Sequence, residues 1–276
     1  MSAFQLMFPP FVAAMLLVAI HGYFGLHVIA RGVIFVDLAL AQMAALGATT
    51  GLLFRIAPDS TEAHLFAIGA VAAGAAILAA TRTKEKTRVP QEAIIGIVYV
   101  VASAAAILVA DRAPRGADVI KDILVGSLLW ITWPTILKDA IAYAAIGAVL
   151  FAFRKPMWTI SFTPEEAKAQ GLRVRWWDFL FYLLFGITVT FSVPIAGVLL
   201  VFTFLVVPAV TAFLFAERPG RMMAIAWTTG TFACTLGLGL SYAWDLPTGP
   251  LVVCTFGGVL LLMSLLRRWM KRGAPA

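Results

Sequence analysis

Charged residues are scarce in this chain, and their scarcity excludes a water-soluble enzyme. Of its 276 residues, 13% are charged and 62% are hydrophobic, with a mean hydropathy of +0.94. Soluble domains carry roughly 45–50% apolar and about 25% charged residues. Because one soluble core cannot enclose so much apolar side chain, the surrounding solvent should be lipid. The sequence therefore predicts an all-α integral membrane protein that crosses the bilayer several times.

Cysteine and histidine are also rare, which leaves little for a disulfide framework or a metalloenzyme. The two cysteines, Cys234 and Cys254, both lie inside apolar runs. His21 and His27 are six residues apart on one predicted helix, so they do not share a face. The chain has no GxxxxGK[ST] loop, no GxSxG elbow and no HExxH helix. We therefore expect no catalytic residue and no cofactor bound by this chain.

Basic residues outnumber acidic ones by 21 to 14, and they cluster in short gaps between apolar runs. This distribution is the positive-inside pattern of membrane proteins, so we expect no nucleic-acid partner. It predicts an N-terminus outside and a C-terminus in the cytosol of a multi-pass membrane protein. The clusters placed in the cytosol are Arg31, 82–88, 154–155, 168–175, 218–221 and 267–272.

Nine apolar stretches have about the 20 residues that a membrane-crossing helix needs. One helix from Arg175 to Glu217 would reach about 60 Å, twice the hydrocarbon thickness. Both of its ends are basic, so the chain should fold back near Pro194, where proline breaks a helix. The predicted spans are 11–30, 33–54, 64–81, 92–110, 136–153, 177–193, 196–216, 221–243 and 250–266.

The number of crossings and the outer surface leave some choices open. Eight crossings are the alternative to nine, because Pro208 interrupts the stretch 196–216. The segment 122–133 is too short to span, and we expect a short helix at the outer surface there. A turn is predicted at the same surface from the proline and glycine content of DLPTGP, with Asp245, Pro247 and Gly249. With no internal repeat or linker, residues 1–276 should form a single transmembrane domain.

One acidic residue lies well inside a predicted span. Asp37 falls in the first half of 33–54, where an acid in lipid is costly and usually functional. The alternative is a structural role, in which Asp37 pairs with Arg31 or caps a helix. Gly197 and Pro208 share another span, where an ordinary kinked helix is the alternative to a pathway role. The pathway candidates are Asp37, Gln42, Glu92, Gly197 and Pro208.

A short polar helix is predicted within the cytosolic segment 154–176. In TPEEAKAQG, Thr163 can cap the N-terminus, Pro164 suits the first turn, and Glu166 completes a capping box. Gly171 fits the position just past the C-terminus. The helix has almost no apolar face for a lipid surface, so it suits docking into another protein. A solvated connector is the alternative. The candidate docking residues are Thr163, Pro164, Glu165, Glu166, Ala167 and Gly171.

Six motifs in this order resemble those of the membrane permeases of ATP-binding-cassette importers for zinc, manganese or iron. The resemblance runs from about Gly25 to Leu266. It implies a fold similar to that of the cobalamin and siderophore importer permeases, with the first helix missing. The motifs are HVIARG at 27–32, EAIIGI at 92–97, DILVGSLL at 122–129, FTPEEAKAQG at 162–171, AGVLLVFTFLVVPAVTA at 196–212 and DLPTG at 245–249.

The resemblance also implies a location in a bacterial plasma (inner) membrane, and it implies partners. Segment 162–171 would be the coupling element that seats in an ATPase, and two such cytosolic ATPase subunits would bind ATP and Mg²⁺. A homodimer of permeases would form the pathway for a divalent metal, which an external metal-binding protein delivers. Where the family usually has Gly-Asp-Ala-Leu-Ser-His, this chain has Asp-Leu-Ala-Leu-Ala-Gln at 37–42. Glutamine is a poorer zinc or manganese ligand than histidine, so the metal stays open.

A secondary transporter driven by an ion gradient is the alternative function. It would need intramembrane acids that form a relay, and the chain offers only Asp37 and, near the end of another span, Asp139. Secondary carriers also often show inverted repeats, which this sequence lacks. An integral-membrane enzyme is a third class, for which the required constellations are missing.

Overall fold

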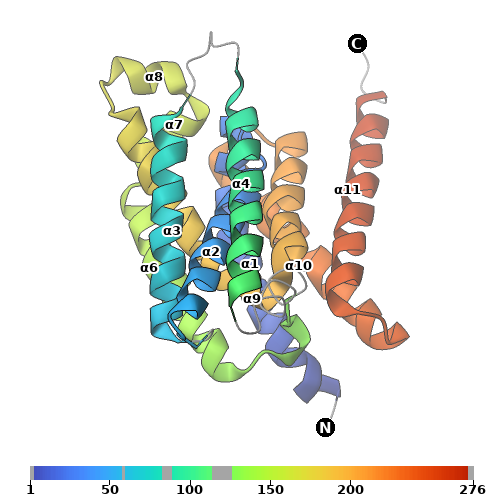
Figure 1. Ribbon diagram of the computed structural model, residues 1–276. Coiled ribbons are helices and arrows are strands. Elements are labelled where there is room, and N and C mark those ends of the chain that lie inside the picture. Colours follow the sequence, from blue (N-terminus) through green and yellow to red (C-terminus); the bar gives the residue numbers. More distant parts are fainter. Residues whose placement is uncertain (1–2, 58–59, 83–88, 114–125, 273–276) are drawn as a thin grey trace. The chain divides into compact units, whose positions relative to one another are not determined.

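The computed structural model describes residues 3–57, 60–82, 89–113 and 126–272, and within these ranges all regular elements are helices (Figure 1). This confirms the predicted all-α class. The elements are α1 (Ala3–Arg31), α2 (Val36–Leu53), α3 (Thr61–Ala80), α4 (Gln91–Arg112), the 3₁₀ turn η1 (Leu128–Trp130), α6 (Trp133–Ala152), α7 (Arg154–Phe162), α8 (Pro164–Ala169), α9 (Val174–Phe215), α10 (Pro219–Trp244) and α11 (Thr248–Arg272).

Eight helices of the described ranges are long and apolar enough to cross a membrane. They are α1, α2, α3, α4, α6, α9, α10 and α11. In lipid every backbone N–H and C=O must be bonded internally, which is why apolar runs of this length fold as helices. The nine predicted stretches correspond to eight helices because α9 contains two of them, 177–193 and 196–216.

A break divides α9, which is 42 residues long. Gly197 has φ 73° and ψ 158°, a backbone conformation that essentially only glycine adopts. The break predicted near Pro194 therefore lies at Gly197 instead. A proline removes one backbone donor and can remain within a helix, whereas the positive φ of Gly197 interrupts the helical path outright. At 1.5 Å per residue, the two parts together measure about 63 Å, which is enough for two crossings.

The chain divides into two compact units. Residues 1–29, 127–143 and 199–276 belong to unit 1, and residues 30–126 and 144–198 belong to unit 2. No linker in the sequence separates the two units. That residues 1–276 form a single transmembrane domain stays a prediction.

Within unit 2, α2 packs against both α3 and α4. The approach of α2 to α3 depends on Gly47, where a Cβ would collide with the backbone of Phe66 and Ala67. Val71 of α3 is fully buried beside these residues. Unit 2 is thus a helical body, and it includes the first turns of α2 and α4, which carry Asp37 and Glu92.

Within unit 1, α10 packs against α11. Gly237 lets the backbones approach, because a Cβ there would lie 2.9 Å from the Cα of Val252. The rings of Phe204 and Phe256 pack edge to face, with centroids 5.4 Å apart.

The two outer-surface predictions have different outcomes. In the described part of 122–133 the short helix is reduced to the 3₁₀ turn η1, and Trp133 already begins α6. Residues 122–125 lie outside the described residues. The predicted turn is shorter than DLPTGP. Asp245 ends α10 with left-handed φ 51° and ψ 44°, but α11 already begins at Thr248, so Gly249 is helical.

Candidate functional site

The short helix α8 is bounded as the sequence predicts. Pro164 occupies its first turn. At the other end Gly171 has φ 67°, and its N–H donates to the Lys168 carbonyl at 3.0 Å. The Leu172 N–H donates to the Ala167 carbonyl at 3.1 Å, which completes a Schellman motif. This pair of bonds gives the segment one defined backbone path into α9.

The predicted capping box at the start of α8 is wrong. Thr163 makes no side-chain cap of α8, and its hydroxyl donates instead to the Thr159 carbonyl at 3.3 Å. Thr163 is also the residue that caps the C-terminus of α7, and its N–H donates to the same Thr159 carbonyl at 2.9 Å, so its hydroxyl lies toward α7. Pro164 lowers the need for a cap, since it brings no N–H of its own.

The surface of α8 is polar and carries both signs of charge. Glu165, Glu166 and Lys168 are exposed, whereas Ala167 is buried. Glu165 and Lys168 form an ion pair of 3.1 Å, which contributes little energy because both side chains remain in solvent. The helix therefore presents charged groups on its surface and has no apolar stripe with which to lie on lipid.

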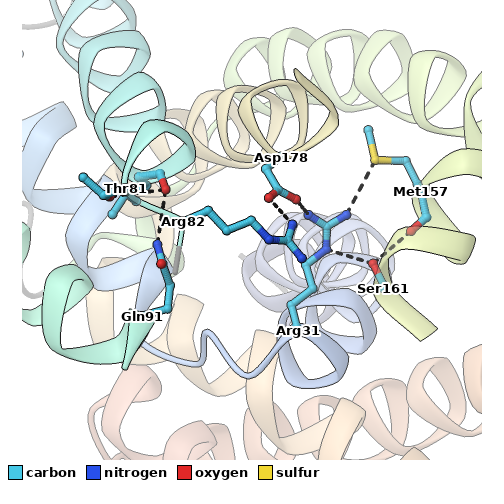
Figure 2. Close-up of polar contacts among 8 residues, drawn as sticks. Arg31, Thr81, Arg82, Gln91, Met157, Ser161 and Asp178 are labelled. Atoms are coloured by element: carbon cyan, nitrogen blue, oxygen red, sulfur yellow. Dashed lines mark hydrogen bonds and ion pairs between the residues drawn. The ribbon is translucent and has the colours of Figure 1, made fainter. Parts of the chain in front are cut away.

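A buried ionic cluster lies beside this segment in unit 2 (Figure 2). Arg31 ends α1, and Gly32 follows with φ 65°, a left-handed conformation that suits a helix C-terminus. The guanidinium of Arg31 donates to Asp178 Oδ1 at 2.8 Å through Nη1 and to Ser161 Oγ at 2.8 Å through Nε. Arg82 forms a second ion pair with Asp178. The Asp178 carboxylate is thus fully buried, and its negative charge is balanced by two arginines.

Sequence reasoning missed this cluster. The signal was present, because Asp178 is the only charge in the apolar stretch between Arg175 and Glu217 and a buried acid requires a partner. The cluster also bears on Asp37, for which a structural role, pairing with Arg31 or capping a helix, is the alternative. The acid that forms the ion pair of 2.8 Å with Arg31 is Asp178, and Asp37 Oδ1 has no hydrogen-bond partner.

Two acidic side chains lie at the start of neighbouring helices in unit 2. Asp37, in the first turn of α2, is 1% exposed, and its Oδ1 has no hydrogen-bond partner. Glu92, in the first turn of α4, accepts a hydrogen bond from the Ile34 N–H through Oε1, whereas Oε2 is buried without a partner. Buried, unpaired carboxylate oxygens are costly and call for a cation or a proton. The structure therefore joins two of the predicted candidates at one end of the helical body.

The other pathway candidates do not join this pair. Gln42 is half-buried and five residues beyond Asp37, so it lies on a different face of α2. Gly197 forms the break in α9. Pro208 belongs to unit 1, where its Cγ would lie 3.4 Å from a Cβ built on Gly230, which indicates a packing role. Within the described residues, no group of three or more His, Cys, Asp or Glu side chains could hold a metal ion.

Comparison with known proteins extends over nearly the whole chain. The model of the ABC 3 transport family matches residues 3–267. The manganese transport system membrane protein MntB of Synechocystis sp. is 30% identical over an alignment of 219 residues that covers 76% of this chain and 71% of that protein. The high-affinity zinc uptake system membrane protein ZnuB of Haemophilus influenzae is 23% identical over 266 residues, which are 96% and 98% of the two chains.

A solved structure shows the same fold. PsaBC from Streptococcus pneumoniae, in complex with Fab, superposes with a TM-score of 0.80 at 23% identity, covering 99% of this chain and 96% of that chain. The family match confirms the resemblance that the six motifs carry. This chain therefore belongs to the ABC 3 transport family and is a multi-pass membrane permease of an ABC transporter.

Proposed function

We propose that this chain is the permease of an ATP-driven importer for zinc, manganese or iron, and that two copies form the pathway. The observation that carries the proposal is α8. It is short, exposed and charged, and Pro164 and Gly171 fix its two ends. Such an element suits a cleft in a partner protein better than a lipid surface. Relatives named for manganese and zinc transport support the choice of cargo.

In this account the partner supplies the energy. The sequence contains no phosphate-binding loop, so two cytosolic ATPase subunits bind ATP and Mg²⁺ and receive α8. An external metal-binding protein delivers the ion to the opposite side. With α8 in the cytosol, the five spanning helices before it start from an N-terminus outside. The two crossings of α9, followed by α10 and α11, then bring the C-terminus back to the cytosol. The basic clusters at 218–221 and 267–272 agree with this orientation.

The acidic pair gives the pathway its polar groups. The unpartnered oxygens of Asp37 and Glu92 attract a cation, yet two carboxylates alone make a weak site. A weak site is what conduction requires, because a tight site would retain the ion. Among the three metals, oxygen donors suit manganese best.

The docking role of α8 is tested by Glu166→Lys combined with Gly171→Pro. The first change reverses an exposed charge in the first turn, and proline cannot adopt the positive φ of Gly171. We expect this variant to remain folded in the membrane and to lose its association with the ATPase, measured by co-purification.

The matched control makes the same two exchanges at another exposed turn. Glu217→Lys with Gly220→Pro lies at the start of α10, where a Cβ on Gly220 would meet no atom within 4 Å. It should retain the ATPase. Normal co-purification of the α8 variant would contradict the docking assignment.

A further inference from the structure

Arg31 holds the two helices that flank α8. Its Nε reaches Ser161 near the end of α7, and its Nη1 reaches Asp178 in the first turns of α9. Its Cζ also lies 4.0 Å from the centroid of the Phe181 ring on α9, a cation–π contact. The side chain is 3% exposed. One guanidinium therefore ties α7 to α9 at the base of the segment that carries α8 (Figure 2).

The geometry of the segment makes this tie mechanically important. Thr163 follows α7 directly, and the Schellman turn at Gly171 leads into α9. Arg31 holds both ends of this segment. The segment of α7, α8 and the start of α9 therefore forms a closed loop. A push on α8 then moves the start of α9, whereas an open base would allow α8 to swing without moving it. Packed helices that move as rigid bodies transmit force in this way.

Arg82 provides an internal comparison. It also pairs with Asp178, but its side chain is 31% exposed and it follows α3. Its guanidinium pairs with Asp178 on the α9 side of the loop, while Arg31 bonds both Ser161 on α7 and Asp178 on α9. Arginine suits the two-sided role because its planar fork donates in several fixed directions.

We propose that Arg31 is a positioning residue of the transport cycle: by bonding Ser161 and Asp178 together it makes α7, α8 and the start of α9 one body, which converts movement of α8 into movement of α9. This inference rests on the proposed function. It adds that the efficiency of coupling, and not the docking of α8, depends on a residue at the end of α1, outside α8 itself.

The test uses Arg31→Lys and Ser161→Ala in the complete assembly of permease, ATPase and metal-binding protein in proteoliposomes. Lysine keeps the charge but loses the planar fork. Alanine removes the bond from Arg31 Nε to α7 and leaves the 3.9 Å contact of Arg31 Nη2 with Met157 Sδ on the same helix. For Arg31→Lys we expect unchanged co-purification of the ATPase, with metal transported per ATP hydrolysed lowered at least about fivefold. Ser161→Ala should lower the same ratio to a smaller extent. A merely structural role would reduce the amount of assembled complex and leave the ratio unchanged.

Arg82→Gln is the matched control, since it removes the partly exposed pair to the same carboxylate. Its ratio should stay within about twofold of the wild type. An unchanged ratio in Arg31→Lys and Ser161→Ala, or an equal fall in Arg82→Gln, would overturn the proposal. If Arg31→Lys does not assemble, an unchanged ratio in Ser161→Ala overturns it alone. Absence of ATP-driven uptake by the wild type would instead contradict the proposed function itself.

Discussion

At the scale of single residues, Asp37 and Glu92 differ in how they are held. Glu92 uses one oxygen to bond the Ile34 N–H, which anchors the bend between α1 and α2. Asp37 lies directly after this bend, with Oδ1 buried and unpartnered. Glu92 is therefore partly structural, and Asp37 is the side chain whose removal should affect transport with less effect on the fold.

We predict that Asp37→Ala lowers metal uptake about tenfold, which corresponds to loss of one charge-assisted contact of about 1.5 kcal/mol. Assembly with the ATPase should be unaffected. Uptake rates in proteoliposomes measure the first effect and co-purification measures the second. Asp111→Ala is the control, because this acid of α4 is 79% exposed. Uptake kinetics identical to the wild type in Asp37→Ala would show that Asp37 is structural or idle.

Some buried charged residues can be recognised from the sequence, and others cannot. An acid inside an apolar run is visible without a structure, which is how Asp37 became a candidate. The Arg31–Asp178 pair is not visible in this way, because the two residues are 147 positions apart. Their pairing depends on which helix ends meet in space, and hydropathy does not encode that order.

At the scale of elements, the break in α9 follows from length, but its position does not. A helix of 42 residues is too long for one crossing, so an interruption is expected. Proline is the usual marker of a break, yet the interruption lies at Gly197. What requires glycine at 197 is the positive φ of 73°. Glycine is also required at the neighbouring position 126, where a Cβ would collide with the backbone of Ala196 and Gly197.

We predict that Gly126→Ala destabilises the protein by about 1–3 kcal/mol, because alanine is strained at φ 69° and would collide with this backbone. The melting temperature of the detergent-purified chain should fall. Gly147→Ala in α6 is the control, since a Cβ there meets no atom within 4 Å. It should be neutral or slightly stabilising. Equal melting temperatures for the two variants would contradict this account of the break.

The ends of α8 show why local patterns succeed in part. Pro164 and Gly171 act through backbone geometry of their own, and both predictions about them are confirmed. The Thr163 hydroxyl has a choice of partners, and the competing end of α7 takes it. Side-chain caps depend on what precedes the helix, so the capping box could not be predicted from the four residues alone.

At the scale of the whole molecule, hydropathy predicts the spans because lipid leaves the backbone no other hydrogen-bond partners. Every predicted span coincides with one of the eight long helices, with ends that differ by a few residues in several cases. The division into two compact units is not predictable in the same way, since each unit combines segments that are distant in sequence. The family match over residues 3–267 then places this architecture among ABC transporter permeases.

The central claim is that this permease moves a divalent metal at the expense of ATP hydrolysed by a partner. The most direct measurement is uptake of labelled zinc, manganese and iron into proteoliposomes that contain this chain and its ATPase, with and without ATP and the metal-binding protein. The account predicts uptake that requires every component and favours one metal. Uptake by this chain alone, driven by an ion gradient without ATP, would contradict it and indicate a secondary transporter.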